Sequence, residues 1–184
     1  MRTAALILAA GTSTRFGSPK QLARIGDRTM LASVIDIARN GGLDPIVAVV
    51  APGISVPADV VPIVNEQPDD GLSRSLRMGI AAMPAEVDGA VILLGDQPTL
   101  AVATVRAVVD AARNGRPVVA ARDDDGRLGP PVMLMRDAFA LAEAAVGDEG
   151  LRSILTRNPE LVTPVEVRAH APDVDTPADL ERLS

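Results

Sequence analysis

A single lysine lies in a glycine-containing segment near the start of the chain. Lys20 is the only lysine among the 184 residues, and the remaining Lys or Arg positions are all arginines. A lysine ammonium is a compact, flexible point charge, whereas an arginine guanidinium is a planar fork. The segment 8–20 directly follows the apolar run Ala4–Leu8, an arrangement in which backbone N–H groups and a lysine hold phosphates. We therefore predict an anion-binding loop, against the alternative that one surface lysine was retained by chance.

This loop differs from both common nucleotide fingerprints. It contains neither G-x-G-x-x-G nor G-x-x-x-x-G-K-[ST], but its small residues permit close backbone approach, and Arg15 and Lys20 flank Gly17. Two cations at this separation suit a triphosphate whose pyrophosphate leaves with its charge neutralised. We predict that Arg15 and Lys20 are catalytic. The residues of this loop predicted to bind the nucleotide are Leu8, Ala9, Ala10, Gly11 and Lys20.

Two acidic segments are candidates for a metal site. The apolar run Ala90–Leu94 ends in Gly-Asp, which places Asp96 at the carboxyl end of a strand, where ligands of open α/β sheets bind. Asp173 and Asp175 share one face if their segment is extended. Because Mg²⁺ is often held by one or two carboxylates plus substrate phosphates, we predict a Mg²⁺ site made by Asp96 and by either Asp173 or Asp175. Asp96 is also predicted to be catalytic; the alternative for both segments is ordinary helix capping.

A fourth segment, residues 65–76, combines amide, glycine and serine residues before a helical pattern. Backbone and hydroxyl donors at the positive end of a helix suit the base or ribose of a nucleotide. The residues predicted to bind the nucleotide here are Asn65, Gly71, Ser73 and Ser75. Capping of the helix by Ser73 explains that serine equally well.

Strand-like and helix-like segments alternate along the chain and must position these residues. Short apolar runs that do not alternate with polar residues are typical of parallel strands buried on both faces. The predicted strands are Ala4–Leu8, Ile46–Ala51, Val60–Val64, Ala90–Leu94, Val118–Ala121 and Val132–Met135. The predicted helices are Met30–Asn40, Ser73–Met83, Thr99–Asn114, Asp137–Val146, Gly150–Arg157 and Pro177–Leu183. We predict one α/β domain over residues 1–184, a Rossmann-like three-layer α/β/α sandwich with a mostly parallel sheet.

Composition excludes several classes of function. The net charge of −6 and the lack of a basic stripe argue against a nucleic-acid-binding surface. No cysteine is present, so disulfides and thiolate metal sites are excluded, and the lone His170 has no partner for a zinc site. The N-terminal apolar run is too short to span a membrane and is followed by a glycine loop, so we expect no signal peptide and a cytoplasmic protein. Three consecutive aspartates at 123–125 precede Gly126 and predict a solvated turn at a hairpin tip.

Four motifs occur in a fixed order and together carry a family resemblance. They are Leu-Ala-Ala-Gly-x-Ser-x-Arg-x-Gly-x-Pro-Lys at 8–20, Leu-Gly-Asp-Gln-Pro at 94–98, Gly-Asp-Glu-Gly at 147–150 and Asp-Val-Asp-Thr-Pro at 173–177. Over essentially its whole length the chain resembles the molybdenum cofactor cytidylyltransferases, a branch of the molybdopterin nucleotidyltransferases. The resemblance implies a nucleotidyltransferase fold, a loop that binds the phosphates of a nucleoside triphosphate, and Mg²⁺ held by Asp96 and Asp175. Ala10, where guanylyltransferases usually have glycine, is similar to the cytidylyl pattern.

The function implied by the resemblance is transfer of CMP from CTP to the terminal phosphate of a pterin acceptor, with release of pyrophosphate. A molybdenum hydroxylase is then a candidate recipient of the product. The alternatives are a transferase that uses GTP or another phosphorylated acceptor, a non-catalytic cofactor-delivery protein, and a nicotinamide-dependent reductase. Two departures from the family pattern concern the acceptor: the segment 65–75 lacks the usual aromatic residue, and Gly129-Pro130-Pro131 lacks the polar residue that often precedes the proline.

Overall fold

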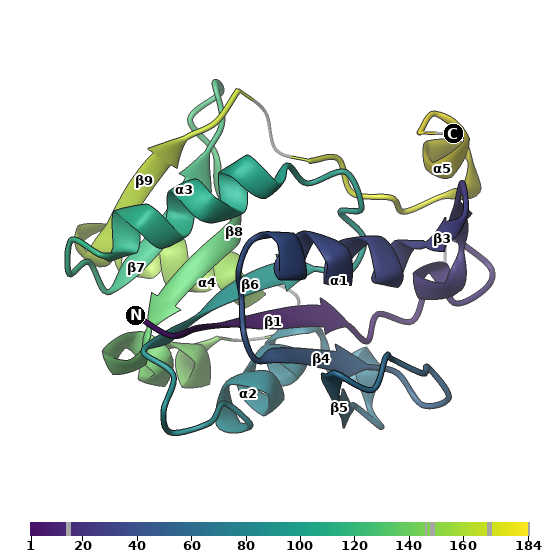
Figure 1. Ribbon diagram of the computed structural model, residues 1–184, viewed down its shortest axis with the longest axis horizontal. Helices are drawn as coiled ribbons and strands as arrows, with labels where there is room; N and C mark the ends of the chain where they lie inside the picture. Colours follow the sequence, from purple (N-terminus) through teal and green to yellow (C-terminus); the bar gives the residue numbers. More distant parts are fainter. Residues whose placement is uncertain (14–15, 146, 148–149, 169–170, 184) are drawn as a thin grey trace.

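The core of the molecule is one twisted sheet. The computed structural model describes residues 1–13, 16–145, 147, 150–168 and 171–183. In these residues seven strands form one sheet in the order β5-β4-β1-β6-β8-β7-β9, and only β8 runs antiparallel to its neighbours (Figure 1). The strands are β1 (Thr3–Ala9), β4 (Ile46–Val50), β5 (Val60–Val64), β6 (Gly89–Leu94), β7 (Val118–Arg122), β8 (Leu128–Met135) and β9 (Val162–Glu166). The predicted α/β class with a mostly parallel sheet is confirmed.

Helices cover both faces of this sheet. α1 (Met30–Asn40) and α3 (Val102–Ala112) lie on one face, in front of the sheet in Figure 1. The opposite face is covered by α2 (Leu72–Ala81), the 3₁₀ helix η3 (Arg136–Ala144) and α4 (Gly150–Arg157). The result is the predicted three-layer sandwich. None of the helices in the described ranges is long and apolar enough to cross a membrane.

The central strand β1 explains why the layers hold together. All seven of its residues are buried, and their side chains alternate between the two faces. Leu6 and Leu8 pack in the core with α2, and Ala5 and Ile7 pack in the core with α1 and α3. A strand covered on both faces needs apolar residues at every position, which is the pattern of this segment.

The edge strands are less apolar than the central ones, and one of them, β9, was not predicted. β9 contains Pro164 and β5 contains Pro62, and proline is tolerated in a sheet at its edges because it has no N–H to donate. The proline and the exposed polar residues of β9 mask its pattern in the sequence. A short hairpin of β2 (Arg24–Ile25) and β3 (Arg28–Thr29) was likewise not predicted.

Three local predictions about helices were wrong. Residues 136–144 form the 3₁₀ helix η3 in place of the predicted α-helix at Asp137–Val146, whose last residue lies outside the described ranges. α3 begins at Val102 and ends at Ala112, so it is shorter at both ends than the predicted helix Thr99–Asn114. Ser73 lies inside α2, because Gly71, with φ +85°, provides the cap conformation that side chains rarely adopt. The aspartates at 123–125 do form the predicted turn between β7 and β8.

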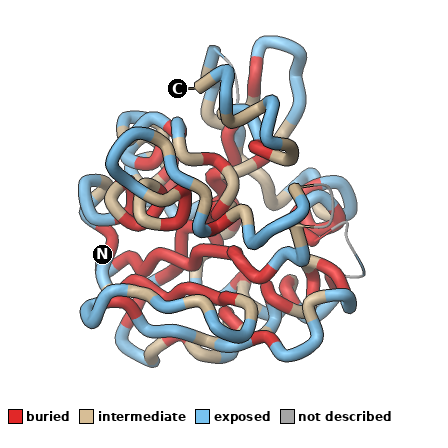
Figure 2. The backbone as a smooth tube through the Cα atoms, turned by 90° about the vertical axis from the view of Figure 1, so that its right-hand side faces the viewer, coloured by how far each residue is buried: buried red, intermediate tan, exposed pale blue. Residues whose placement is uncertain are grey.

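The loops that follow β1, β4 and β6 lie toward the right-hand side of Figure 1. There the short helix η1 (Lys20–Leu22) and the β2–β3 hairpin lie beside α5 (Pro177–Glu181), the last helix of the chain. Figure 2 faces this side and shows buried strands surrounded by exposed loops. The two remaining 3₁₀ helices in the described ranges are η2 (Pro68–Asp70) and η5 (Pro159–Leu161).

Candidate active site

The loop after β1 is held in place by a buried glutamine. The side-chain amide of Gln21, only 3% exposed, donates to the carbonyl oxygens of Ala9 and Gly11, each at 2.9 Å. The backbone N–H of Lys20 donates to the Ser13 hydroxyl at 3.1 Å. These bonds tie residues 9, 11 and 13 of the loop to Lys20 and Gln21 through polar groups of the protein itself, without help from a ligand.

The loop after β6 approaches the first loop so closely that it requires glycine. The N–H of Gly95 donates to the Leu8 carbonyl at 2.9 Å. A Cβ on Gly95 would lie 2.6 Å from the Cβ of Ala9. Glycine therefore allows β6 to carry the next residue, Asp96, to the edge of the first loop.

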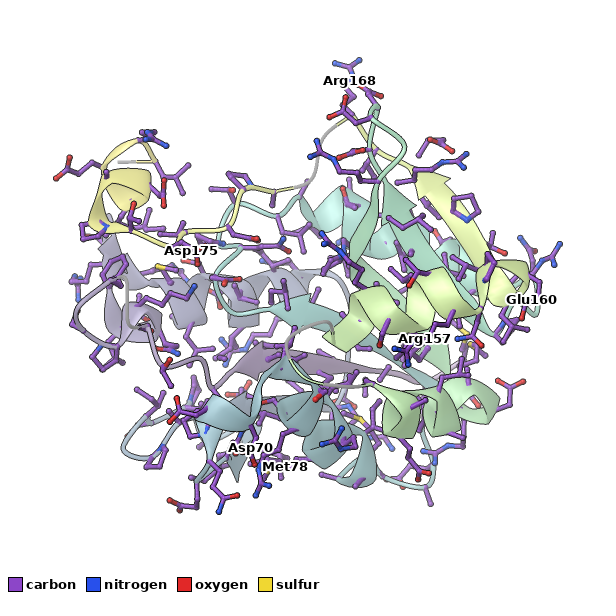
Figure 3. All side chains as sticks on the ribbon, turned by 180° about the vertical axis from the view of Figure 1, so that it is seen from behind. Asp70, Met78, Arg157, Glu160, Arg168 and Asp175 are labelled. Carbon is purple, nitrogen blue, oxygen red and sulfur yellow. The ribbon has the colours of Figure 1, made fainter. Side chains whose placement is uncertain are left out.

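A third segment, near the C-terminus, is fixed to the same place. The N–H of Val174 donates to the backbone carbonyl of Asp96 at 3.0 Å, and the Val174 side chain is fully buried. Further along, Thr176 and Asp179 form a capping box at the start of α5, with Pro177 in the first turn. The buried Val174 on one side and the capped start of α5 on the other fix the position of Asp175. Figure 3 shows Asp175 beside the N-terminal loop.

Lys20 joins the two carboxylates that these segments deliver. Its Nζ lies 2.8 Å from Asp96 Oδ2 and 2.9 Å from Asp175 Oδ1. The side chain of Lys20 is 13% exposed and that of Asp96 is 22% exposed. Residues that are 76 and 155 positions from Lys20 in the chain thus meet at the carboxyl edge of the sheet.

Burial and charge act in opposite directions on Lys20. Burial by itself lowers the pKa of the ammonium, but attraction to Asp96 and then the bonds to Asp96 and Asp175 outweigh it, so the pKa lies above its ordinary value. Lys20 therefore remains charged at neutral pH and is a permanent cation of the site.

Asp173 is the third carboxyl group at this edge. Its Oδ1 accepts a hydrogen bond of 2.9 Å from the amide of Gln97, which also donates to the Ala171 carbonyl at 3.3 Å. Burial raises the pKa of Asp173, and repulsion by the Asp96 carboxylate adds to the rise. The field at Asp173 is therefore negative in spite of the nearby Lys20.

The donor set fits a hard divalent cation whose coordination is completed by oxygens of the substrate. Asp96 and Asp175 already share one cation, and Asp96 Oδ1 is buried without a hydrogen-bond partner. Within the described residues, no group of three or more His, Cys, Asp or Glu is arranged to hold a metal ion alone. Two carboxylates with phosphate oxygens and water are the usual environment of Mg²⁺.

Two adjoining cavities open at this edge. The smaller, about 230 Å³, is lined by the first loop, by Lys20 and Asp96, and by Gly71 and Ser75 at the start of α2. The larger, about 950 Å³, is lined by the 123–130 turn, by α4 and by the segment 171–173. Leu72 and Leu94 line both, so the cavities are neighbours.

The structure brings together most of the predicted site residues. Those that line the smaller cavity are Leu8, Ala9, Ala10, Gly11, Lys20, Gly71, Ser75 and Asp96. Three others do not: Asp175 contacts Lys20 from outside this lining, Ser73 is buried inside α2, and Asn65 is buried with its amide bonded to Ser75 Oγ at 3.0 Å and its oxygen bonded to Arg74. Asn65 therefore orders the segment before α2. Arg15, predicted to be catalytic, lies outside the described residues, as does His170.

Sequence reasoning missed Gln21, Gln97 and Val174, which position the site without chemistry of their own. Gln21 and Gln97 directly follow Lys20 and Asp96, but nothing in their residue type indicates burial. Val174 stands between two aspartates, and an apolar residue inside an acidic segment is the one signal that was available.

Comparison with known proteins places this geometry in a family. The MobA-like NTP transferase domain matches residues 5–162. The bifunctional protein GlmU of Clavibacter sepedonicus is 36% identical over 135 residues, which are 66% of this chain and 27% of GlmU. The 2-C-methyl-D-erythritol 4-phosphate cytidylyltransferase of Streptomyces coelicolor is 29% identical over 197 residues, which are 100% of this chain and 66% of that protein. The chain thus spans about a quarter of the GlmU relative and about two thirds of the cytidylyltransferase.

Solved structures agree with these matches. The crystal structure of Rv0371c from Mycobacterium tuberculosis H37Rv has a TM-score of 0.87 and 30% identity, covering 100% of this chain and 97% of that one. A second structure of Rv0371c is a complex with manganese, with a TM-score of 0.83 and 29% identity, covering 100% of this chain and 98% of that one. Because the family match extends over most of the chain and across the loop, Lys20 and Asp96, this protein belongs to the MobA-like NTP transferase domain family.

Proposed function

We propose that this protein is a nucleotidyltransferase that transfers CMP from CTP to the terminal phosphate of a pterin acceptor, the molybdenum cofactor or its precursor. Pyrophosphate is the second product. The observation that supports this proposal is the meeting of Lys20, Asp96 and Asp175 beside the smaller cavity, which Lys20 and Asp96 line and which adjoins a larger one. One cavity is bordered by an anion-binding loop, and the other is large enough for a second substrate.

In the reaction, an oxygen of the acceptor phosphate forms a bond to the α-phosphorus of CTP. The bond from that phosphorus to the oxygen bridging the α- and β-phosphates breaks, and pyrophosphate leaves with the electron pair. The rate of such a transfer depends mainly on the positioning of the substrates and on neutralisation of their charge. The loop 8–11 and Lys20 hold the triphosphate in the smaller cavity, and Lys20, together with Arg15, stabilises the leaving pyrophosphate.

A divalent ion, when bound by Asp96 and Asp175, supplies Lewis-acid stabilisation of the phosphate oxygens. Mg²⁺ is the ion we propose, since carboxylate and phosphate oxygens suit it. The manganese complex of the relative Rv0371c supports the use of a divalent ion in the family.

The larger cavity is our proposed acceptor site. Leucines and prolines form apolar walls suited to a flat ring system, and Arg127, Arg152 and Arg168 lie along its border. Arg127 is paired with Asp123 and Asp125, and Figure 3 shows Arg168 at the outer end of the molecule, well separated from Asp175. Arg152, in the first turn of α4, is therefore our choice for the acceptor's anionic group.

The test is release of pyrophosphate from CTP and Mg²⁺ in the presence of molybdopterin. We expect release with wild type, and loss of it in Asp96→Asn and Asp175→Asn. The matched control is Asp110→Asn, the same chemical change on the exposed face of α3, which should behave as wild type. No pyrophosphate with any phosphorylated acceptor would contradict the transferase assignment.

Other outcomes of this assay identify the alternatives. Release that requires a different phosphorylated acceptor or GTP keeps the transferase and replaces the substrate. Tight binding of the cofactor without turnover indicates delivery to a molybdenum hydroxylase. Oxidation of NADPH without pyrophosphate indicates the reductase.

A further inference from the structure

Lys20 contacts the two carboxylates and also lines the smaller cavity. Its ammonium bridges Asp96 and Asp175, and the same residue lines the smaller cavity, where the proposed function puts the triphosphate. The structure shows the ammonium on the carboxylates.

We propose that the Lys20 ammonium holds the place of the divalent cation between Asp96 and Asp175 while no nucleotide is bound, and that metal ion and ammonium exchange there. The proposal rests on the proposed function, because that function defines the metal and the triphosphate. It adds that the lysine is displaced when the metal enters, so that the two cations do not share the carboxylates.

The distances exclude that the ammonium and a metal ion bind the same two carboxylate oxygens together. Nζ is within 2.9 Å of one oxygen from each carboxylate, so the ammonium fills the space between Asp96 and Asp175. A Mg²⁺ ion held by the same two oxygens at about 2.0–2.1 Å would occupy that space. The ammonium must therefore leave before an ion binds these two oxygens.

The backbone of Lys20 is fixed, whereas the ammonium end of its side chain is free to change position by rotation. Its backbone N–H is tied to the Ser13 hydroxyl at 3.1 Å, and the following Gln21 side chain is fixed to the carbonyls of the first loop. The four-carbon stem beyond this anchor has several rotatable bonds. Rotation about these bonds carries Nζ from the carboxylates toward the cavity without a change in the loop.

Charge gives the exchange its direction. One ammonium between two carboxylates leaves a net negative charge, and Asp96 Oδ1 remains buried without a partner. A divalent ion neutralises the pair, and a triphosphate in the cavity offers the released ammonium new anionic partners. Metal and nucleotide should therefore bind cooperatively, each favouring the state of Lys20 that the other needs.

The only lysine of the chain makes the exchange directly visible. Protein labelled with ¹³C,¹⁵N-lysine gives one side-chain Cε–Nζ signal. We expect Mg²⁺, added without nucleotide, to shift this signal and to speed exchange of the ammonium hydrogens with water, because they lose their carboxylate partners. An unchanged signal at Mg²⁺ concentrations that fill the site would overturn the proposal.

A second measurement uses Mn²⁺ binding to the nucleotide-free protein, followed by the electron paramagnetic resonance signal of free Mn²⁺. Lys20→Met keeps an unbranched apolar stem and removes the competing cation, so Mn²⁺ should bind on the order of tenfold tighter than to wild type. Arg152→Met removes one positive charge at the neighbouring cavity and serves as control, with a change of less than about threefold.

Equal or weaker Mn²⁺ binding in Lys20→Met, or no binding in either protein, would overturn the exchange. Circular dichroism establishes that the variant is folded, and the lysine signal of wild type needs no variant. Neither measurement involves CTP or an acceptor. Failure of cytidylyl transfer therefore leaves the exchange standing, and failure of the exchange leaves the transfer assay unaffected.

Discussion

Gly95 and Ala9 approach so closely that a Cβ on Gly95 would lie 2.6 Å from the Cβ of Ala9 and 3.1 Å from its Cα. The backbone of β1 cannot move aside without disturbing the centre of the sheet. Gly95→Ala should therefore destabilise the protein by about 1–3 kcal/mol, the usual cost of overpacking. Urea unfolding measures the free energy, and a variant as stable as wild type would show that the two loops separate easily.

Gly11 provides the opposite case in the same cavity. A Cβ there would meet no protein atom within 4 Å. Gly11→Ala should change stability by no more than about 0.5 kcal/mol, yet its methyl group would enter the space of the phosphates. We expect the thermal stabilisation by CTP and Mg²⁺ to fall, and unchanged stabilisation would place the triphosphate elsewhere.

The Gln21 amide should be essential to the shape of the first loop. Gln21→Met keeps much of the volume but removes the donors to the Ala9 and Gly11 carbonyls, which should cost about 1–3 kcal/mol. Hydrogen exchange of the loop amides should also accelerate. Gln67→Met, the same change at an exposed position, is the control and should leave both measurements near wild type.

Asp173 should make stability depend on pH. Its folded-state pKa is raised, so the folded protein binds the proton more tightly than the unfolded chain, and stability falls as pH rises through the folded-state pKa. Asp173→Asn removes this loss and still offers an oxygen to Gln97. Its stability relative to wild type should rise with pH from about 4 upward and then level off, as measured by urea unfolding. A relative stability that falls over this range would contradict the assigned direction.

The parts of the site that lie at strand ends were predictable. The apolar runs that form β1 and β6 define their carboxyl ends, and parallel strands bring such ends to one edge. This rule predicts that the loop with Lys20 and the turn with Asp96 are neighbours, as the structure shows. It does not predict the direct contact of Lys20 with two carboxylates, because sequence spacing carries no information on side-chain conformation.

The segment before α2 shows where sequence reasoning fails. Serine and glycine both favour helix starts, and the pattern does not reveal which residue takes the cap. Gly71 takes it, which moves Ser73 into the buried face of α2 and leaves Ser75 at the cavity. Asn65 looked like a ligand-binding amide, but its hydrogen bonds are made to Ser75, Gln67 and Arg74.

Ala10 should help to select the nucleotide. Ala10 is buried and lines the smaller cavity, as do Gly71, Leu72 and Ser75 from the start of α2. The methyl group narrows this cavity relative to glycine, so a pyrimidine nucleotide should be favoured over a larger purine nucleotide. With Mg²⁺ present, CTP should raise the unfolding midpoint of wild type more than GTP does, because only a bound ligand shifts it.

Removal of this methyl group should reduce the preference for CTP. In Ala10→Gly the stabilisation by GTP should increase, and the ratio of CTP to GTP affinity should fall by roughly 10-fold or more, the scale of one methyl group in a binding pocket. Ala82→Gly, at the end of α2 and outside both cavities, controls for general loosening of the protein. A larger midpoint shift with GTP than with CTP in wild type would overturn the cytidylyl assignment while leaving the transferase fold intact. An unchanged ratio of CTP to GTP affinity in Ala10→Gly would indicate that the base is selected by residues at the start of α2, such as Gly71 and Ser75, and not by Ala10.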